Sequence, residues 1–250
     1  MSKLLITCGN FFFRHRNNLF PLFMVLAALL VRPTLPRGSA AVNNATDLLG
    51  AGITLFGQFI RIFTIGYKYI KRGGKNKQVF AETLVQEGVF AHCRNPMYAG
   101  NLLIFLGITV MVHSPLLYVA GLAFIGFVYA SIIAAEEKYL RERFGAEFDR
   151  YCERVPRLFF TFRGFRASLA GQPFQWRRVV LREFGTVTGT LVALIAIRCG
   201  SLHLLFGAEA APEIRRWCWA LPVIAVFYLT AYVLKKTHIL LETPADPKPL

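Results

Sequence analysis

The sequence predicts an all-α protein: a polytopic transmembrane helical bundle with a central helical hairpin and an interfacial amphipathic helix. Hydrophobic residues make up 55% of the 250 residues and charged residues only 17%, and the mean hydropathy is +0.45. The apolar residues come in long blocks, which is typical of membrane-spanning helices rather than of a soluble core. We therefore interpret residues 1–250 as a single membrane domain, with a core at 48–160 and additional C-terminal helices at 184–234.

Two apolar runs, Met97–Val112 and Leu116–Ala135, form the predicted hairpin. Only the short segment His113–Pro115 separates them. A turn this short makes the two helices antiparallel neighbours, so the polar clusters that flank them return to the same membrane face. We expect the chemistry at that shared end, between the clusters Glu82–Gly100 and Glu136–Arg157.

Four further apolar runs are expected to meet the membrane: Leu19–Val31, Leu48–Ile70, Phe184–Phe206 and Trp217–Leu234. The first run is shorter than the roughly 20 residues of a straight span, so it either crosses a thinned bilayer or lies in the interface. Arg61 lies deep in the second run. An arginine there either binds a carboxylate or helix end within the bundle, or it has a functional role.

The third of these runs carries two features of its own. Gly185, Gly189 and Ala193 recur at four-residue spacing, which predicts a surface for close helix packing within the chain. Arg198 and His203 lie near its far end, where we expect them to snorkel to the interface or to cap the helix.

The formal charge of +15 comes from Lys and Arg in the linkers beside the apolar runs. No basic helix or arm is free of membrane segments, so we expect no nucleic acid partner. The positive-inside rule places both linkers that flank the hairpin in the cytoplasm, which predicts six spans with both termini inside. The five cysteines are widely spaced and lack metal-ligand spacing, so we interpret them as reduced thiols and expect no metal.

The motif CRNPMYAG opens the first helix of the hairpin. Asn95 is suited to cap the free backbone N–H groups, and Pro96 suits the first helical position. A helix that begins at the cytoplasmic surface also offers N–H donors to a carboxylate or phosphate. Arg94 is then either a further partner for that anion or an anchor for lipid headgroups.

Glu136 and Glu137 directly follow the second run of the hairpin. Their spacing favours solvated residues at a helix exit, with Lys138 and Arg141 as partners. The alternative is that one carboxylate turns inward to bind hydroxyls, an ammonium group or another cation. Apolar residues then recur at three- and four-residue intervals across 140–158, which predicts an interfacial amphipathic helix that covers the space between the two clusters.

These motifs, taken in order, resemble the isoprenylcysteine carboxyl methyltransferase and phospholipid methyltransferase superfamily of membrane enzymes. The matching elements are LVxxGxF, RNPMYxG, an apolar hairpin, EE, FGxEFxxY and RVPR, which together cover Glu82–Arg157. The resemblance implies an S-adenosyl-L-methionine site at the cytoplasmic end of the helices. It also implies a lipid or isoprenoid-type acceptor that enters from within the bilayer.

The resemblance further implies a set of site residues. Glu136 is the expected base for an amine acceptor, and Arg154, in the closing RVPR motif, is the second expected catalytic residue. Tyr98 and Glu137 are expected to meet around a common small molecule. Together with Arg94 as the anion partner, the expected cofactor contacts are Thr83, Leu84, Val85, Phe90, Arg94, Asn95, Pro96, Met97, Tyr98 and Glu137.

The chain departs from the family pattern at three places. Asn95 and Glu82 stand where the family usually has His, so a mechanism cannot use an imidazole at either position. The segment Ser131–Ala135 lacks the arginine that prenylcysteine-type members carry before the Glu pair, which weakens the case for carboxyl methylation. Two other functions stay open: a sterol-reductase-like nicotinamide-dependent membrane reductase and a non-catalytic membrane scaffold.

Overall fold

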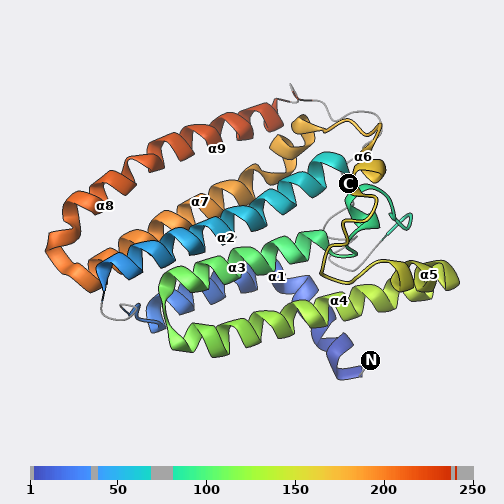
Figure 1. Cartoon of the computed structure of the whole chain (residues 1–250), viewed down its shortest axis with the longest axis horizontal. Helices are drawn as coiled ribbons and strands as arrows, with labels where there is room; N and C mark the ends of the chain where they lie inside the picture. The colour runs from blue at the N-terminus through green and yellow to red at the C-terminus, as the bar shows by residue number, and fades with distance from the viewer. Residues whose placement is uncertain (1–2, 35–38, 69–80, 238–239, 241–250) are drawn as a thin grey trace.

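Helices make up the structure, a computed structural model that describes residues 3–34, 39–68, 81–237 and 240 (Figure 1). No strand occurs among these residues, so the predicted all-α class is confirmed. In chain order the elements are α1 (Lys3–Leu30), α2 (Ala40–Tyr67), the 3-10 turn η2 (Gly88–Ala91), α3 (Pro96–Val112), the π-helical turn η3 (Leu117–Gly121), α4 (Leu122–Phe144), α5 (Ala146–Arg154), α6 (Phe165–Leu169), α7 (Trp176–Phe206), the 3-10 turn η4 (Gly207–Ala210), α8 (Ala211–Cys218) and α9 (Ala220–Lys236).

Three helical stretches in the described part of the chain are long and apolar enough to cross a membrane: Ala40–Tyr67, Leu117–Phe144 and Trp176–Lys236. The last stretch folds back on itself, because α9 returns alongside α7 (Figure 1). The shorter apolar helix α3 packs along α2. The protein is therefore an integral membrane helical bundle.

The predicted helical hairpin is present. The helix α3 ends at Val112, and His113 adopts a left-handed conformation with φ of 52°. The chain then reverses through η3 into α4, which continues past Ala135 to Phe144. Glu136 and Glu137 therefore lie within a helix and not beyond its end.

The first helix is longer than the apolar run predicts. It begins at Lys3 rather than Leu19, and it lies antiparallel along α4. At its start, a Cβ on Gly9 would lie 2.0 Å from the carbonyl oxygen of Ser131, and further along it Phe23 stacks on Phe124 at 5.1 Å between ring centroids. The segment before Leu19 contains polar residues, so a search for long apolar runs does not identify this part of the helix.

The second helix also begins before its predicted start. It begins at Ala40, and the Ser39 side chain caps it by accepting a hydrogen bond from the backbone N–H of Val42. Its predicted end at Ile70 and most of the basic linker that follows lie outside the described residues.

The backbones of α2 and α3 touch at glycines. Gly50 and Gly57 on α2 face Gly107 and Gly100 on the antiparallel α3. A Cβ on Gly107 would lie 2.3 Å from the carbonyl oxygen of Gly50, and a Cβ on Gly57 would lie 2.6 Å from that of Gly100. Only glycine fits at such distances, and the close approach supports the packing of these two membrane helices.

The small residues of α7 do not form such a contact. A Cβ on Gly185 or Gly189 would meet no atom within 4 Å, and both residues are exposed. The prediction of an intrachain packing stripe there is therefore wrong. Spacing alone cannot tell which face of a helix is covered.

A buried ion pair joins α7 to the rest of the bundle. The Arg61 guanidinium donates from Nε and Nη2 to the two carboxylate oxygens of Glu183, each at 3.0 Å. Gln58 donates to the same carboxylate at 3.3 Å, and Arg61 also donates to Asn101 of α3. Of the two roles open for Arg61, the structure shows a carboxylate partner within the bundle, which neutralises both buried charges.

A second buried network lies at the opposite end of the bundle from α5 and α6. Arg198 of α7 donates to Asp47 and, at 2.7 Å each, to Asn44 and Glu213. His113, in the hairpin turn, lies 3.2 Å from Asp47. The expectation that Arg198 snorkels to the interface is therefore wrong, because this arginine is buried among partners from two other helices.

The glycine contact predicts a steric cost. We expect Gly107→Ala to lower the free energy of unfolding by about 1–3 kcal/mol, because the new Cβ overlaps the Gly50 carbonyl. Thermal unfolding of the purified protein in detergent measures the change. Gly126→Ala, on an open face of α4, is the matched control, and equal melting temperatures for the two variants would contradict the proposed contact.

The buried ion pair predicts a larger cost. We expect Glu183→Gln to lower the free energy of unfolding by about 3–5 kcal/mol, since it leaves the buried Arg61 charge without its counter-charge. The control is Glu142→Gln, which removes an exposed carboxylate paired with Lys138 on α4 and costs about 0–1 kcal/mol. A melting temperature for Glu183→Gln that matches the control would show that the pair does not hold α7 in place.

Candidate active site

The polar clusters that flank the hairpin meet around Glu137, at the end of the bundle that carries α5 and α6 (Figure 1). This residue is only 4% exposed. Its Oε1 accepts hydrogen bonds from Arg94 Nη1 and from Arg157 Nε, both at 2.9 Å, and its Oε2 accepts from Arg157 Nη2 at 2.5 Å. One carboxylate is thus held between two arginines from segments that are far apart in the chain.

The expectation of solvated glutamates with local partners is wrong for Glu137. Lys138 pairs instead with Glu142, and Arg141 pairs with Asp149. Spacing along one helix predicts partners on that helix, whereas the partners of Glu137 come from the segments before α3 and after α5. Arg94 is likewise a partner of Glu137 in this structure, rather than an exposed lipid anchor.

The neighbouring carboxylate has a different partner. The hydroxyl of Tyr98, in the first turn of α3, donates to Glu136 Oε1 at 2.7 Å. The helix α1 brings Arg16 into electrostatic range of both groups. Tyr98 and the two glutamates therefore lie at one end of the bundle, but the direct contact of Tyr98 is with Glu136. A common ligand between Tyr98 and Glu137 stays a prediction.

The amino end of α3 is left without a side-chain cap. Pro96 is its first residue, as predicted, but Asn95 does not cap the helix. Asn95 Nδ2 donates instead to the carbonyl oxygen of Arg157 at 3.0 Å, and the backbone N–H of Arg94 donates to the carbonyl of Pro156 at 2.9 Å. The segment after α5 is thereby held against the start of α3, while no side chain in the described part of the chain caps the first N–H groups of α3.

The predicted amphipathic helix is broken in two. Gly145 adopts φ of 53°, which ends α4 and starts the separate helix α5. The apolar side of α5, formed by Phe148, Tyr151 and the adjacent Val155, packs on protein residues such as Leu84. The apolar side of α5 therefore rests on the chain itself at these positions, and its role as a cover between the two clusters stays a prediction.

The other predicted residues are distributed around this cluster. Phe90 and Met97 are buried, and the carbonyl of Phe90 accepts a hydrogen bond from the Tyr151 hydroxyl at 2.7 Å. Thr83 is exposed and Val85 is half-buried, both in the segment before η2.

Arg154 lies apart from the ion cluster. It is exposed, and it donates to the side chain of Gln86 at 3.2 Å and to the carbonyl of Arg150 at 3.3 Å. The contact to Glu137 is made by Arg157, which the motif-based list of site residues omitted. The signal was present in the sequence, because Arg157 is the last residue of the same RVPR motif.

Two cysteines border the cluster. Cys152 lies 2.8 Å from Arg94 Nη1, and the thiol of Cys93 contacts the carbonyl of Arg157. Burial raises the pKa of Cys93 to about 11 and also raises the pKa of Cys152. Both therefore stay protonated at neutral pH, so neither provides a ready thiolate nucleophile.

Comparison with known proteins shows what this part of the chain resembles. Residues 46–147 match the family described as phospholipid methyltransferase. This region contains α3, α4, Tyr98 and both glutamates. The resemblance to the isoprenylcysteine carboxyl methyltransferase and phospholipid methyltransferase superfamily that the motifs indicate is confirmed over this region.

The chain is also similar to individual proteins, two named as methyltransferases and one named as a metal-resistance protein. The chain is 37% identical over 73 residues to Protein-S-isoprenylcysteine O-methyltransferase B of Arabidopsis thaliana, which covers 29% of this chain and 37% of the relative. It is 31% identical over 155 residues to the Cobalt-zinc-cadmium resistance protein CzcN of Cupriavidus metallidurans, covering 60% of this chain and 66% of the relative. It is 30% identical over 111 residues to Protein-S-isoprenylcysteine O-methyltransferase of Saccharomyces cerevisiae, covering 43% and 46%.

The chain thus spans between 37% and 66% of the length of these relatives. No solved structure matches it at a comparable level of significance.

Proposed function

We propose that this protein is an integral-membrane methyltransferase that uses S-adenosyl-L-methionine to methylate a lipid or isoprenoid-type acceptor, on oxygen or nitrogen, at the cytoplasmic interface. The proposal rests on one observation. The region that matches the methyltransferase family, 46–147, contains the start of α3 and the Glu136–Glu137 pair, which come together at one end of the bundle. Two of the relatives described above are named as O-methyltransferases.

The residues at the start of α3 fit the carboxylate of the proposed cofactor. The first N–H groups of this helix have no side-chain cap, and the helix dipole favours an anion at this position. The buried Nε of Arg94 has no hydrogen-bond partner among the described residues. An anion at this point would satisfy donors that are otherwise unpaired.

Glu137 fits the positive or hydroxyl groups of the same molecule. Both of its oxygens accept hydrogen bonds from arginines, and a ligand can take the place of one of these contacts. The side chain of Arg157 is 48% exposed, whereas that of Arg94 is 14% exposed. Arg157 is therefore the partner that gives way, and its movement toward water would cost less than moving the buried arginine.

Methyl transfer requires the protein mainly to align the acceptor with the cofactor. S-adenosyl-L-methionine supplies a methyl group on a reactive sulfonium, so the site has to orient the acceptor and exclude water. An amine acceptor must lose a proton, and the proposed base is Glu136, whose Oε1 accepts a hydrogen bond from the Tyr98 hydroxyl, or else interfacial water. A carboxylate acceptor would need no base.

Charge supports a cytoplasmic position for this end of the bundle. Arginines are frequent in the segment that connects α5 to α7 and in the first turns of α7: Arg157, Arg163, Arg166, Arg177, Arg178 and Arg182. Loops rich in Lys and Arg stay on the cytoplasmic side of a membrane. The proposed site lies at this basic end.

The test of the proposed function is a labelling experiment. The purified protein is incubated with S-adenosyl-L-methionine carrying an isotopically labelled methyl group and with a lipid extract of the host, and the lipids are analysed by mass spectrometry. We expect label in a lipid or isoprenoid species. Cofactor binding without any labelled lipid would contradict the acceptor class, and retention of a nicotinamide cofactor instead would favour a reductase.

Removing the negative charge of Glu137 is expected to lower the affinity for the cofactor. We expect Glu137→Gln to weaken S-adenosyl-L-methionine binding by about tenfold or more, because a charge-assisted interaction becomes a neutral one. Isothermal titration of the detergent-solubilised protein measures the affinity. Glu142→Gln, which removes an exposed carboxylate from the same helix, should leave it unchanged. Unchanged binding by a folded Glu137→Gln variant would contradict the assignment of Glu137 to the cofactor site.

A further inference from the structure

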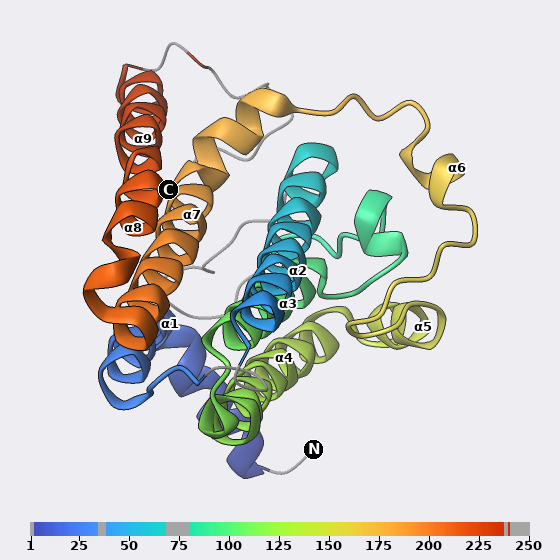
Figure 2. The same ribbon diagram turned by 60° about the vertical axis from the view of Figure 1, so that its left-hand side comes forward.

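A groove between α7 and α9 lies away from the candidate active site. Its lining residues are Phe184 on α7 and Tyr228, Tyr232, Lys235 and Lys236 on α9, and its volume is about 520 Å³. Figure 2 shows α9 on the opposite side of α7 from α4, the helix that carries Glu137. The groove is therefore a separate surface of the bundle.

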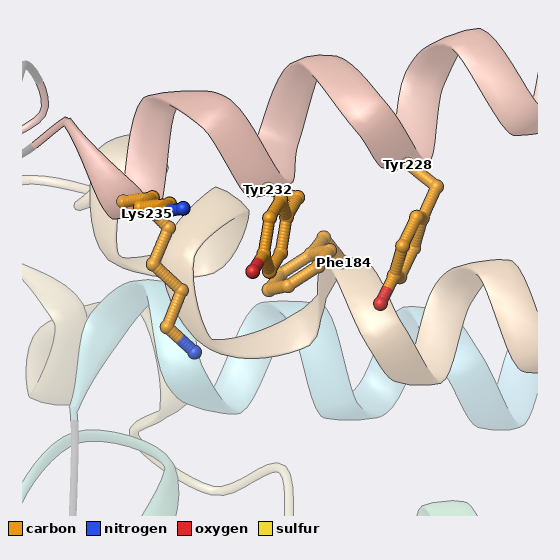
Figure 3. Close-up of a pocket in the computed structure, with 5 residues that line it drawn as sticks. Phe184, Tyr228, Tyr232 and Lys235 are labelled. Atoms are coloured by element: carbon orange, nitrogen blue, oxygen red, sulfur yellow. The ribbon is translucent and has the colours of Figure 1, made fainter.

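The aromatic side chains form an amphipathic wall. Phe184 projects from α7 toward the tyrosines of α9, as Figure 3 shows, and its ring centroid lies 5.3 Å from that of Tyr228. The two tyrosine rings are stacked at 6.3 Å. Tyrosine favours the headgroup level of a membrane, because its ring is apolar and its hydroxyl is polar.

Two lysines line one end of the groove. Lys235 and Lys236 are the last residues of α9, and Lys235 Nζ lies 5.3 Å from the centre of the Phe184 ring. None of the described residues that line the groove is acidic. The acidic neighbour of Phe184, Glu183, is fully buried on another face of α7 against Arg61. The groove is therefore positively charged at its end and apolar along its wall.

The position of the groove along the bundle also suits a lipid. Lys235 and Lys236 lie at the end of the bundle where α7 begins with Arg177, Arg178 and Arg182. The helix α9 exposes an apolar side chain beside this face, with Leu229 58% exposed. A molecule that satisfies both parts needs an anionic group at the interface and a hydrocarbon chain within the bilayer.

We propose that this groove binds an anionic phospholipid, with its phosphate at Lys235 and Lys236 and the start of an acyl chain against Phe184 and Tyr228. The lysines and the hydroxyl of Tyr232 supply donors to the phosphate oxygens. The aromatic wall and the exposed apolar side of α9 cover the chain. This site is independent of the proposed methyl transfer, because none of its residues belongs to the candidate active site.

The test is a competition between two lipids in native mass spectrometry. The full-length protein is released from mixed micelles that contain equal amounts of phosphatidylglycerol and phosphatidylcholine, and the lipid adducts are counted. We expect the wild type to retain phosphatidylglycerol preferentially. The variant Lys235→Gln/Lys236→Gln should lose about 30-fold in that preference, as expected for two surface lysines.

Two further variants make the result specific to the groove. Lys138→Gln/Arg163→Gln removes two exposed charges elsewhere at the same end of the bundle, and it should keep the preference. Lys235→Arg/Lys236→Arg keeps both charges and should also retain the anionic lipid. Equal loss in the Lys138→Gln/Arg163→Gln control, or no loss in the Gln variant of the groove, would overturn the proposal.

An inorganic phosphate arm separates a lipid site from a simple anion site. Millimolar phosphate added to the micelles should leave the phosphatidylglycerol adducts in place, since most of the binding comes from the chain and the interface. Displacement of the lipid by free phosphate would overturn the assignment of a phospholipid. Melting temperatures of all variants establish that each is folded before the adducts are compared.

Discussion

The pairing of buried carboxylates with arginines from other helices is the constraint on which this bundle depends. Glu183 is fully buried, and it is neutralised by Arg61, 122 positions earlier in the chain. Asp47 and Arg198 form a comparable pair at the other end. An unpaired charge inside a membrane protein is costly, so these pairs favour the arrangement in which α7 lies against α2.

The same interaction has a different character at the candidate active site. Glu137 is buried like Glu183, but one of its two arginines, Arg157, comes from a loop and is half exposed. A pair with one partner in water exchanges its contacts more easily than a pair locked between two helices. The ion pairs within the bundle therefore hold the helices, whereas the pair at its end is suited to admit a ligand.

Much of the fold was predictable because apolar length and short turns are local properties. The hairpin followed from two apolar runs joined by three residues, and the structure confirms it. The start of the first helix was missed because polar residues before Leu19 are helical without being apolar. The break at Gly145 was missed because the apolar period continues across it, although the backbone there takes a positive φ.

The sequence by itself determined the helical membrane class, the hairpin and the motif residues that gather at one end. Hydrophobic length and the order of motifs are properties of the linear sequence, so no tertiary structure is needed to find them. Only the tertiary structure decided which charges meet. Arg157 rather than a neighbour on the same helix contacts Glu137, Tyr98 contacts Glu136, and Asn95 bonds a loop carbonyl instead of capping its helix. Such contacts join segments distant in sequence, so local spacing carries no information about them.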